Sequence, residues 1–468
     1  MNLQKSALRE IWQDIREAIA GTERDFTTTS LGKAIFILSV PMVLEMIMES
    51  VFAVVDIFFV SRLGANAVAT VGITESVMTI VYAIGGGLST ATTALVARRI
   101  GEKDPAKAGT AAFQAILLAF LVSTLISLPG MLYARSFLRL MGATEEMVSE
   151  GFLYPAILFG SSGIVMLLFI INAVFRSSGD AAVSMRVMWL ANIINLVLDP
   201  ILIFGLGPIP AMGIKGAAIA TAIGRSIAVV YQFYLLFQSH HRIHLTLNSI
   251  KFQPRIMASL LKVSVGGILQ NMISTSSWII LVRIIAVSGA AALAGYTIAI
   301  RIVLFALLPA WGISNAAATL VGQNLGAGRP DRAERSVWIT SYINMAVMGI
   351  VSVFLVLFPD AFIRMFIHDP EVVRQGAIAL QIISLGFTFY ALSMVMVQGF
   401  NGSGDTLTPT LVNFVCFWLV EIPLAWLLAT TLGLGLTGAS WAIVIAESLL
   451  AVIAWFLFRR GKWKERKI

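Results

Sequence analysis

The chain has 468 residues, of which 58% are hydrophobic and only 12% are charged, and its mean hydropathy is +0.87. This composition lies far from that of a water-soluble domain, so it argues against a soluble enzyme. The formal net charge of +8 would suit nucleic acid, but the basic residues follow the ends of apolar segments instead, and we expect no nucleic-acid partner. Lipid is therefore the expected solvent.

Twelve apolar stretches follow one another along the chain, each long enough to cross about 30 Å of hydrocarbon as a helix. They cover approximately residues 34–60, 67–97, 110–133, 152–175, 185–206, 213–237, 257–287, 292–322, 336–358, 376–400, 409–430 and 436–458. The sequence therefore predicts an all-α membrane protein of twelve transmembrane helices.

Lys and Arg are unevenly divided between the two sides of these spans. The side that holds the N-terminus carries 24 of them and the opposite side 6, while Arg225, Arg283 and Arg301 fall within spans. Because basic residues are retained on the cytoplasmic side, both termini are expected in the cytoplasm and the protein in a bacterial or archaeal inner membrane. Cys416 is the single cysteine, so no intramolecular disulfide can form.

The two halves of the sequence resemble each other at a shift of 225 residues. The shift superposes Gly64 on Gly289, Gly101 on Gly326, Phe137 on Phe362, and residues 178–180 on 403–405, both Ser-Gly-Asp. Because six spans separate the copies, an even number, both enter the membrane in the same sense and the repeat axis should follow the membrane normal. We expect two pseudo-symmetric six-helix lobes with a cleft between them, which suits alternating access.

The expected organisation is a cytoplasmic leader over 1–33, an N-lobe over 34–237, a polar cytoplasmic linker over 238–256, a C-lobe over 257–458 and a basic cytoplasmic tail over 459–468. Apolar residues recur at helical spacing in the leader at Leu8, Ile11, Trp12, Ile15 and Ile19. They fit either a helix on the inner leaflet or a disordered leader. The linker histidines 240, 241 and 244 could bind a metal, but a solvated linker needs none.

Three carboxylates lie within the first span, where each is costly and so marks a candidate for ion or substrate handling. Glu45, Glu49 and Asp56 are about 40° and 20° apart on a helix of 3.6 residues per turn. They therefore share one face and form an acidic stripe.

The fifth span places Asn195 and Asp199 one turn apart, with Asn192 one residue off that face. An amide carbonyl and a carboxylate at this spacing offer hard oxygen ligands for a small cation, or a proton-labile hydrogen-bonded pair. The hydroxyl of Thr221 in span six could complete such a site, or could bond to its own helix backbone.

The second half lacks these groups, because the counterparts of Asp56, Asn195 and Asp199 are Leu281, Val420 and Leu424. We therefore expect the acidic site in the N-lobe only. The C-lobe carries Arg283, Arg301 and Glu421, which we expect to form a buried Arg–Glu pair; a role in substrate binding or gating is the alternative. Glu75 and Glu447 are further single acids near span positions.

Several motifs together resemble the multidrug and toxic compound extrusion (MATE) family over essentially the whole length. They are Pro41 with Val55-Asp56 and Gly64, the stretch 321–327 (VGQNLGA), Asn195 with Leu198-Asp199-Pro200, and the paired Ser-Gly-Asp turns. An acid in span one with the span-five pair resembles the DinF-like branch, rather than the branch marked by an acid in span seven.

The resemblance implies a secondary transporter that exports amphipathic, often cationic, compounds in exchange for inward H+ or Na+. It places the cation site at Asp56, Asn195, Asp199 and Thr221, with Na+ held by the first three, and implies no cofactor. Pro41 would serve as a hinge, because its missing amide hydrogen weakens the helix there. Glu45, Glu49, Asn192, Arg283, Arg301 and Glu421 are candidates for substrate contact or gating.

Two other functions compete with this interpretation. A flippase for a lipid-linked precursor would favour a strongly cationic cleft, for which only Arg283 and Arg301 are candidates. A membrane-embedded enzyme would need a convergent nucleophile or metal constellation, and the sequence contains no Walker, nucleophile-elbow or HExxH motif. We expect partners to be small organic substrates and the bilayer, and the protein to act as a monomer.

Overall fold

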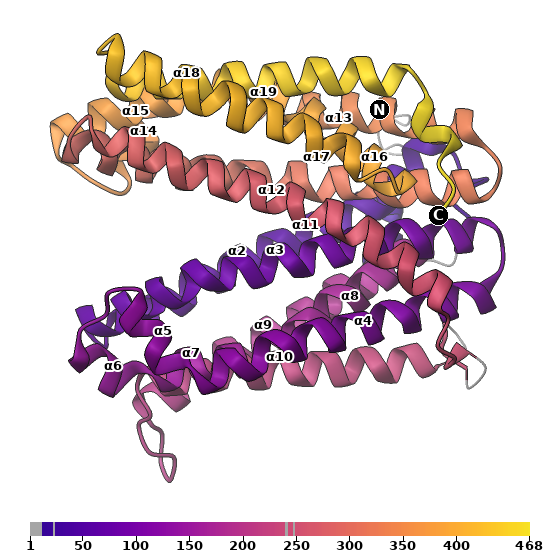
Figure 1. Cartoon of the computed structure of the whole chain (residues 1–468), viewed down its shortest axis with the longest axis horizontal. Helices are drawn as coiled ribbons and strands as arrows, with labels where there is room; N and C mark the ends of the chain where they lie inside the picture. The colour runs from indigo at the N-terminus through magenta and orange to yellow at the C-terminus, as the bar shows by residue number, and fades with distance from the viewer. Residues whose placement is uncertain (1–11, 22–23, 239–241, 247–248) are drawn as a thin grey trace.

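A computed structural model describes residues 12–21, 24–238, 242–246 and 249–468 (Figure 1). Over these residues the chain is helical and forms no strand, apart from an isolated bridge between Leu206 and Ile209. The all-α class is therefore confirmed. Residues 12–20 are helical, and the side chain of Trp12 is exposed; Leu8, Ile11, His240 and His241 lie outside the described residues.

The N-lobe contains nine helices in the described part of the chain. They are α2 (Leu31–Ser61), α3 (Ala65–Gly101), α4 (Pro105–Leu132), α5 (Ala134–Leu140), α6 (Glu145–Gly151), α7 (Leu153–Gly160), α8 (Ser162–Ser178), α9 (Ala181–Phe204) and α10 (Ile214–Phe237). Local chemistry sets their ends: Asp104 accepts a hydrogen bond from the Lys107 amide ahead of α4, and Gly179 ends α8 at a φ of 100°.

The helices of the C-lobe and of the tail follow. They are α11 (Pro254–Ala286), α12 (Ala290–Gly326), α13 (Pro330–Leu357), α14 (Pro359–Arg364), α15 (Pro370–Leu385), α16 (Phe387–Ser403), α17 (Leu407–Asn413), η2 (Phe414–Glu421), α18 (Ile422–Trp426), η3 (Leu427–Thr431), α19 (Gly435–Arg459) and η4 (Lys462–Glu465). The second Ser-Gly-Asp turn repeats the first, because Gly404 ends α16 at a φ of 86°. The segments η2 and η3 are π-helical, within one continuous span.

Ten helices of the described chain are long and apolar enough to cross a membrane, or eleven if α15 and α16, bent by 52° at their junction, form one span. The first predicted span, α2, is not among them, although its 31 residues extend about 46 Å. It carries Glu45, Glu49 and Asp56. The helical membrane architecture is therefore confirmed, whereas the count of twelve is reached only by adding α2 as a crossing.

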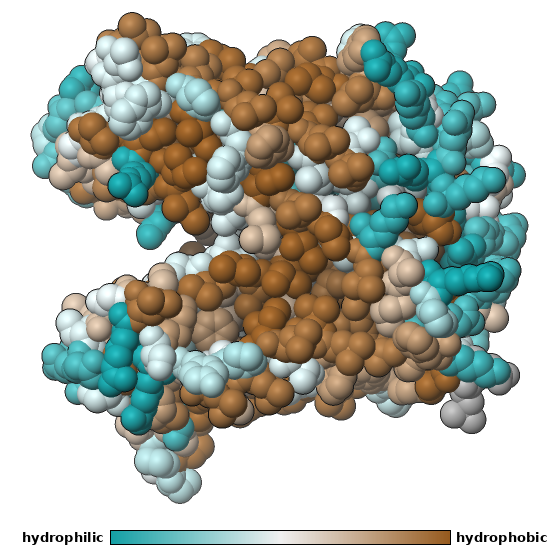
Figure 2. All heavy atoms as spheres, viewed as in Figure 1, coloured by the Kyte–Doolittle hydropathy of each residue, from teal (hydrophilic) through white to brown (hydrophobic). Residues whose placement is uncertain are grey.

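The two lobes meet at one end of the molecule and splay apart at the other (Figures 1 and 2). Each has its own apolar core, although the first turns of α11 pack into the core of the N-lobe through Met257, Leu260 and Val263. Helices α2 and α3 of the N-lobe pack against α11 and α12 of the C-lobe. The notch seen in Figure 2 lies between the splayed ends.

The close helix contacts between α2, α3 and α11, α12 form a seam between the lobes. Glycines allow these contacts, and they occur in pairs related by the 225-residue shift. Gly101 on α3 packs against the carbonyl of Gln323 on α12, and its counterpart Gly326 packs against the carbonyl of Arg98, the counterpart of Gln323. Deeper in the seam the same exchange joins Gly87 to Ile268 and Gly312 to Val43. The internal repeat seen in the sequence is thus also a structural repeat across the lobe interface.

At the joined end, which is hydrophilic in Figure 2, arginines form hydrogen bonds to the backbone of segments that are distant in sequence. Arg98 Nη1 in the N-lobe donates to the carbonyl of Arg466 in the tail, at 2.8 Å. Arg329 Nη1 in the C-lobe donates to the carbonyl of Thr27 before α2, also at 2.8 Å. The segment that precedes α2 and the basic tail therefore lie at the same end of the molecule, as the charge distribution predicted.

Replacing Trp463 with alanine should lower the free energy of unfolding by about 3–5 kcal/mol, the usual cost of truncating a buried aromatic side chain. Trp463 is 1% exposed, its ring lies 4.6 Å from that of Phe458, and its Nε1 donates to the Phe458 carbonyl. Denaturant unfolding in detergent checks this. Trp12→Ala, at a position 68% exposed, is the matched control; equal effects would contradict the prediction.

Candidate functional site

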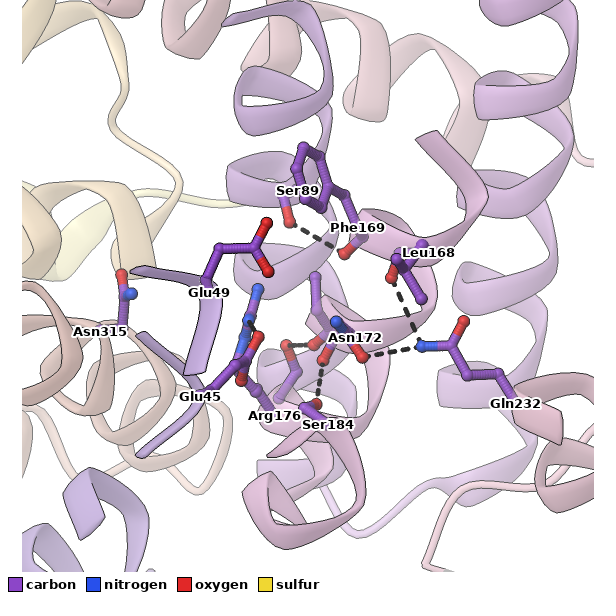
Figure 3. Close-up of polar contacts among 12 residues, drawn as sticks. Glu45, Glu49, Ser89, Leu168, Phe169, Asn172, Arg176, Ser184, Gln232 and Asn315 are labelled. Atoms are coloured by element: carbon purple, nitrogen blue, oxygen red, sulfur yellow. Dashed lines mark hydrogen bonds and ion pairs between the residues drawn. The ribbon is translucent and has the colours of Figure 1, made fainter. Parts of the chain in front are cut away.

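A polar cavity of about 350 Å³ lies at the base of the cleft, where the two lobes join. The N-lobe contributes Glu45, Glu49 and Arg176 to its wall, and the C-lobe contributes Asn315 and Gln398. Figure 3 shows Glu45 and Glu49 on α2 beside Arg176 on α8, with Asn315 across from them. Two of the three sequence-predicted acids of α2, Glu45 and Glu49, therefore face the space between the lobes.

The first acid of the stripe forms a buried ion pair. Arg176 Nη1 lies 2.9 Å from Glu45 Oε1, and Glu45 is 3% exposed, with Oε2 lacking a partner. The predicted fourth span ends at residue 175, which leaves Arg176 in the following loop; in the structure α8 continues to Ser178, and Arg176 lines the central cavity. Its position at the predicted edge of an apolar span concealed it.

The other two acids of the stripe, Glu49 and Asp56, contact side chains of the neighbouring helix α9. Asn192 Nδ2 donates to Glu49 Oε2 at 3.1 Å. About two turns further along both helices, the carboxyl groups of Asp56 and Asp199 are in hydrogen-bond contact. Two carboxyl groups can meet in this way only when one of them carries a proton, or when a cation replaces it.

Asn195 and Thr221 complete this cluster. In the amide orientation that satisfies every neighbour, Asn195 donates to Asp199 Oδ2 at 2.9 Å and its oxygen accepts from the Thr221 amide and hydroxyl, each at 3.0 Å. Asn195 and Asp199 are 2% and 0% exposed. The structure thus brings together all four residues that the sequence and the family resemblance indicated.

A second cavity, of about 330 Å³, adjoins this cluster. It is lined by Asp56 and Thr221, together with Glu75 and Arg225, and it shares Glu49 with the central cavity. Asp56 therefore borders a cavity that lies beside the central one. The position of Glu75 is now fixed as part of this wall.

Arg225 is a residue that the sequence interpretation recorded without assigning a role. It lies one turn after Thr221 on α10, hydrogen-bonds to Tyr82 and stacks over Phe52 at 5.9 Å. A fixed positive charge beside Glu49 and Glu75 compensates part of the negative charge of the cavity. Its location inside a span, one turn from Thr221, was the signal that could have identified it.

The predicted C-lobe ion pair is wrong. Arg283 and Arg301 are both exposed, whereas Glu421 is 1% exposed and accepts a hydrogen bond from Ser277 at 2.7 Å. A hydroxyl satisfies the carboxyl group there, so no guanidinium needs to be buried. Glu447, the other acid that the sequence analysis noted in this half, is also buried.

Pro41 lies inside α2, which continues through it as one helix, and its side chain is buried. In the described chain, no three His, Cys, Asp or Glu side chains come close enough to hold a metal ion. Two helical lobes around a central cleft, with carboxyl groups buried in the spans, are typical of a secondary transporter.

Comparison with known proteins identifies the family. The MatE family profile matches residues 41–201 and again 267–427, once in each half, and the chain belongs to this family of transporters. The probable multidrug resistance protein NorM of Thermotoga maritima is 28% identical, with 94% of both chains covered. The FAD transporter of Shewanella oneidensis is 25% identical, over 92% of this chain and 95% of that protein.

Solved structures share the whole fold. A MATE in the straight conformation is 25% identical, with a TM-score of 0.88 over 94% of this chain and 98% of that one. An outward-facing multidrug resistance MATE transporter of the MOP superfamily gives the same TM-score at 24% identity and the same coverage.

Proposed function

We propose that this protein is a multidrug efflux transporter of the DinF-like branch, which exports amphipathic, mainly cationic compounds in exchange for H+ or Na+. The observation that carries the proposal is the Asp56–Asp199 contact, supported by Asn195 and Thr221 and bordered by a cavity that adjoins the central one. Relatives named as multidrug resistance and multidrug export proteins support the substrate class.

The carboxyl pair couples ion entry to the position of α2. Proton or Na+ binding between Asp56 and Asp199 holds α2 against α9, and loss of the cation leaves two like charges that repel each other. Because α2 also packs against α12, its displacement changes the lobe interface. Pro41 gives α2 a point at which to bend.

The orientation follows from the basic end. With both termini in the cytoplasm of the inner membrane, the joined end faces inward and the notch faces outward. Each cation that enters gains about 2.3 kcal/mol per 100 mV of membrane potential, in addition to its concentration gradient. One chain encloses the complete cleft, which supports a monomeric transporter.

The charges of the cleft favour this cargo over a lipid-linked precursor. A pyrophosphate group would require a cationic cavity, whereas Arg176 is already paired with Glu45 and the remaining acid of that wall is Glu49. The exposed Arg283 and Arg301 are not among the residues that line this cavity.

The test is efflux of a fluorescent cationic dye from proteoliposomes under an imposed proton or Na+ gradient. Asp56→Asn and Asp199→Asn should each reduce gradient-driven efflux to background. An amide in place of either carboxyl group carries no negative charge, so the altered pair can no longer bind and release the coupling cation. Asp360→Asn, at an exposed position in α14, is the matched control and should behave like the parent.

The gradient that drives the parent identifies the coupling ion. Efflux that persists undiminished in both variants would contradict the proposed coupling site. An intact, folded parent that moves no cationic dye under either gradient would contradict the substrate class.

A further inference from the structure

The C-lobe contains a larger cavity than either of those already described, of about 600 Å³. Helices α11, α12, α16 and α19 and the π-helical η2 supply most of its wall. Asn271 and Gln398 line both this cavity and the central one, so the two cavities adjoin. The central cavity thus has one neighbouring cavity in each lobe.

The wall of the C-lobe cavity combines aromatic, aliphatic and neutral polar side chains with one acid. Its aromatic residues are Trp278, Trp311, Tyr390 and Phe417, and its acid, Glu447, is 8% exposed. The carboxylate receives only a long hydrogen bond, at 3.4 Å, from Ser393. Among the described residues no cationic side chain forms an ion pair with it, so a buried acid lacks a strong partner.

Neighbouring polar groups also have unused acceptors. Asn413 is 5% exposed and lines the cavity; its Nδ2 reaches Ser274 at 3.4 Å, while its Oδ1 has no partner. The Oε1 of Gln270, on the same wall, is likewise buried without a partner. Unpaired buried acceptors favour an occupant that brings positive charge or donors.

Glu447 and Glu421, two buried acids of the C-lobe, are not copies of the acids in the N-lobe cluster. The repeat places Glu447 on Ala222 and Glu421 on Leu196, each one residue beyond the counterparts of Thr221 and Asn195. A shift of one residue turns a side chain by about 100° around a helix. The span that carries Glu421 is also π-helical over Phe414–Glu421, a conformation frequent at functional sites.

We propose that this C-lobe cavity binds one amphipathic organic cation, with its apolar body among the aromatic rings and its positive charge beside Glu447. The inference rests on the proposed function for the class of cargo and adds the site. A volume of about 600 Å³ lies within the range of drug-sized pockets, roughly 300–1,000 Å³. Aromatic faces attract organic cations, and a desolvated carboxylate strengthens that attraction.

The experiment is equilibrium binding of radiolabelled tetraphenylphosphonium to the purified full chain in detergent, with triphenylphosphine oxide as an uncharged probe of similar shape. Glu447→Gln should weaken binding of the cation by about tenfold or more and leave the uncharged probe unaffected. Glu447→Asp should retain most of the affinity. Trp278→Ala should weaken binding of both probes, because it removes a wall that both contact.

Asp360→Asn is the control, because Asp360 is an exposed acid of the same lobe and does not line the cavity. It should bind the cation like the parent. An unchanged affinity in folded Glu447→Gln, or an equal loss in Asp360→Asn, would overturn the assignment. Binding is measured without an ion gradient, so a failure of the proposed ion coupling would not change the binding result. Conversely, a failure of binding at this site would not change the result of the dye-transport experiment on the parent.

Discussion

Replacing Gly101 or Gly326 with leucine is expected to reduce transport to background, because the lobes can then no longer close at the basic end. A Cβ atom at Gly101 would lie 1.9 Å from the Gln323 carbonyl oxygen, and one at Gly326 would lie 2.0 Å from the Arg98 carbonyl oxygen. Both obstacles are backbone atoms of a packed helix, which cannot rotate away as a side chain can. A shift from 99% closed to 99% open needs only about 5.5 kcal/mol.

Spin labels at positions 103 and 328, which the repeat relates and which flank the seam, would report the separation of the lobes. Both leucine variants should show a longer distance and no gradient-driven efflux. Gly72→Leu is the matched control, because Gly72 also lies on α3 but meets no atom within 4 Å. Unchanged distance and transport in the Gly101 and Gly326 variants would show that the seam tolerates a gap.

Arg176→Ala is expected to lower the free energy of unfolding by about 3–5 kcal/mol, because it leaves the Glu45 carboxylate buried without its cation. The double variant Glu45→Gln with Arg176→Gln removes both charges and should recover most of that loss. Denaturant unfolding in detergent measures both differences.

The matched control for this pair is Arg139→Ala. Arg139 and Glu145 also lie 2.7 Å apart, but their side chains are 53% and 74% exposed, so water screens the pair and the loss should be much smaller. Equal losses in Arg176→Ala and Arg139→Ala would contradict the view that burial makes the Glu45–Arg176 pair important.

Much of the fold could be predicted because lipid imposes a simple rule, namely long apolar helices with basic residues at one end. The internal repeat could be recognised in the sequence because glycines such as Gly101 and Gly326 lie at contacts too close for any larger residue. The exact number of crossings was less accessible. A stretch such as α2 combines the length of a span with three carboxylates.

The N-lobe cluster could be predicted because a carboxylate in a span is rare, and helical spacing alone puts Glu45, Glu49 and Asp56 on one face. The partners of those acids on other helices were harder to infer. Arg176 lay at the uncertain end of a span, and the choice between Ser277 and an arginine for Glu421 depends on tertiary geometry that no local pattern records.

The lobe interface has the form of a symmetric dimer contact written into one polypeptide. Gly101 meets Gln323 as Gly326 meets Arg98, so one surface patch faces its own copy, as in an isologous homodimer. A true homodimer would have to carry identical pockets on both sides. Fusion of the halves removes that constraint, so one half can keep Asp56 and Asp199 while the other acquires Glu447 among aromatic rings. The covalent link thus allows the two lobes to carry different sites while they keep a symmetric interface.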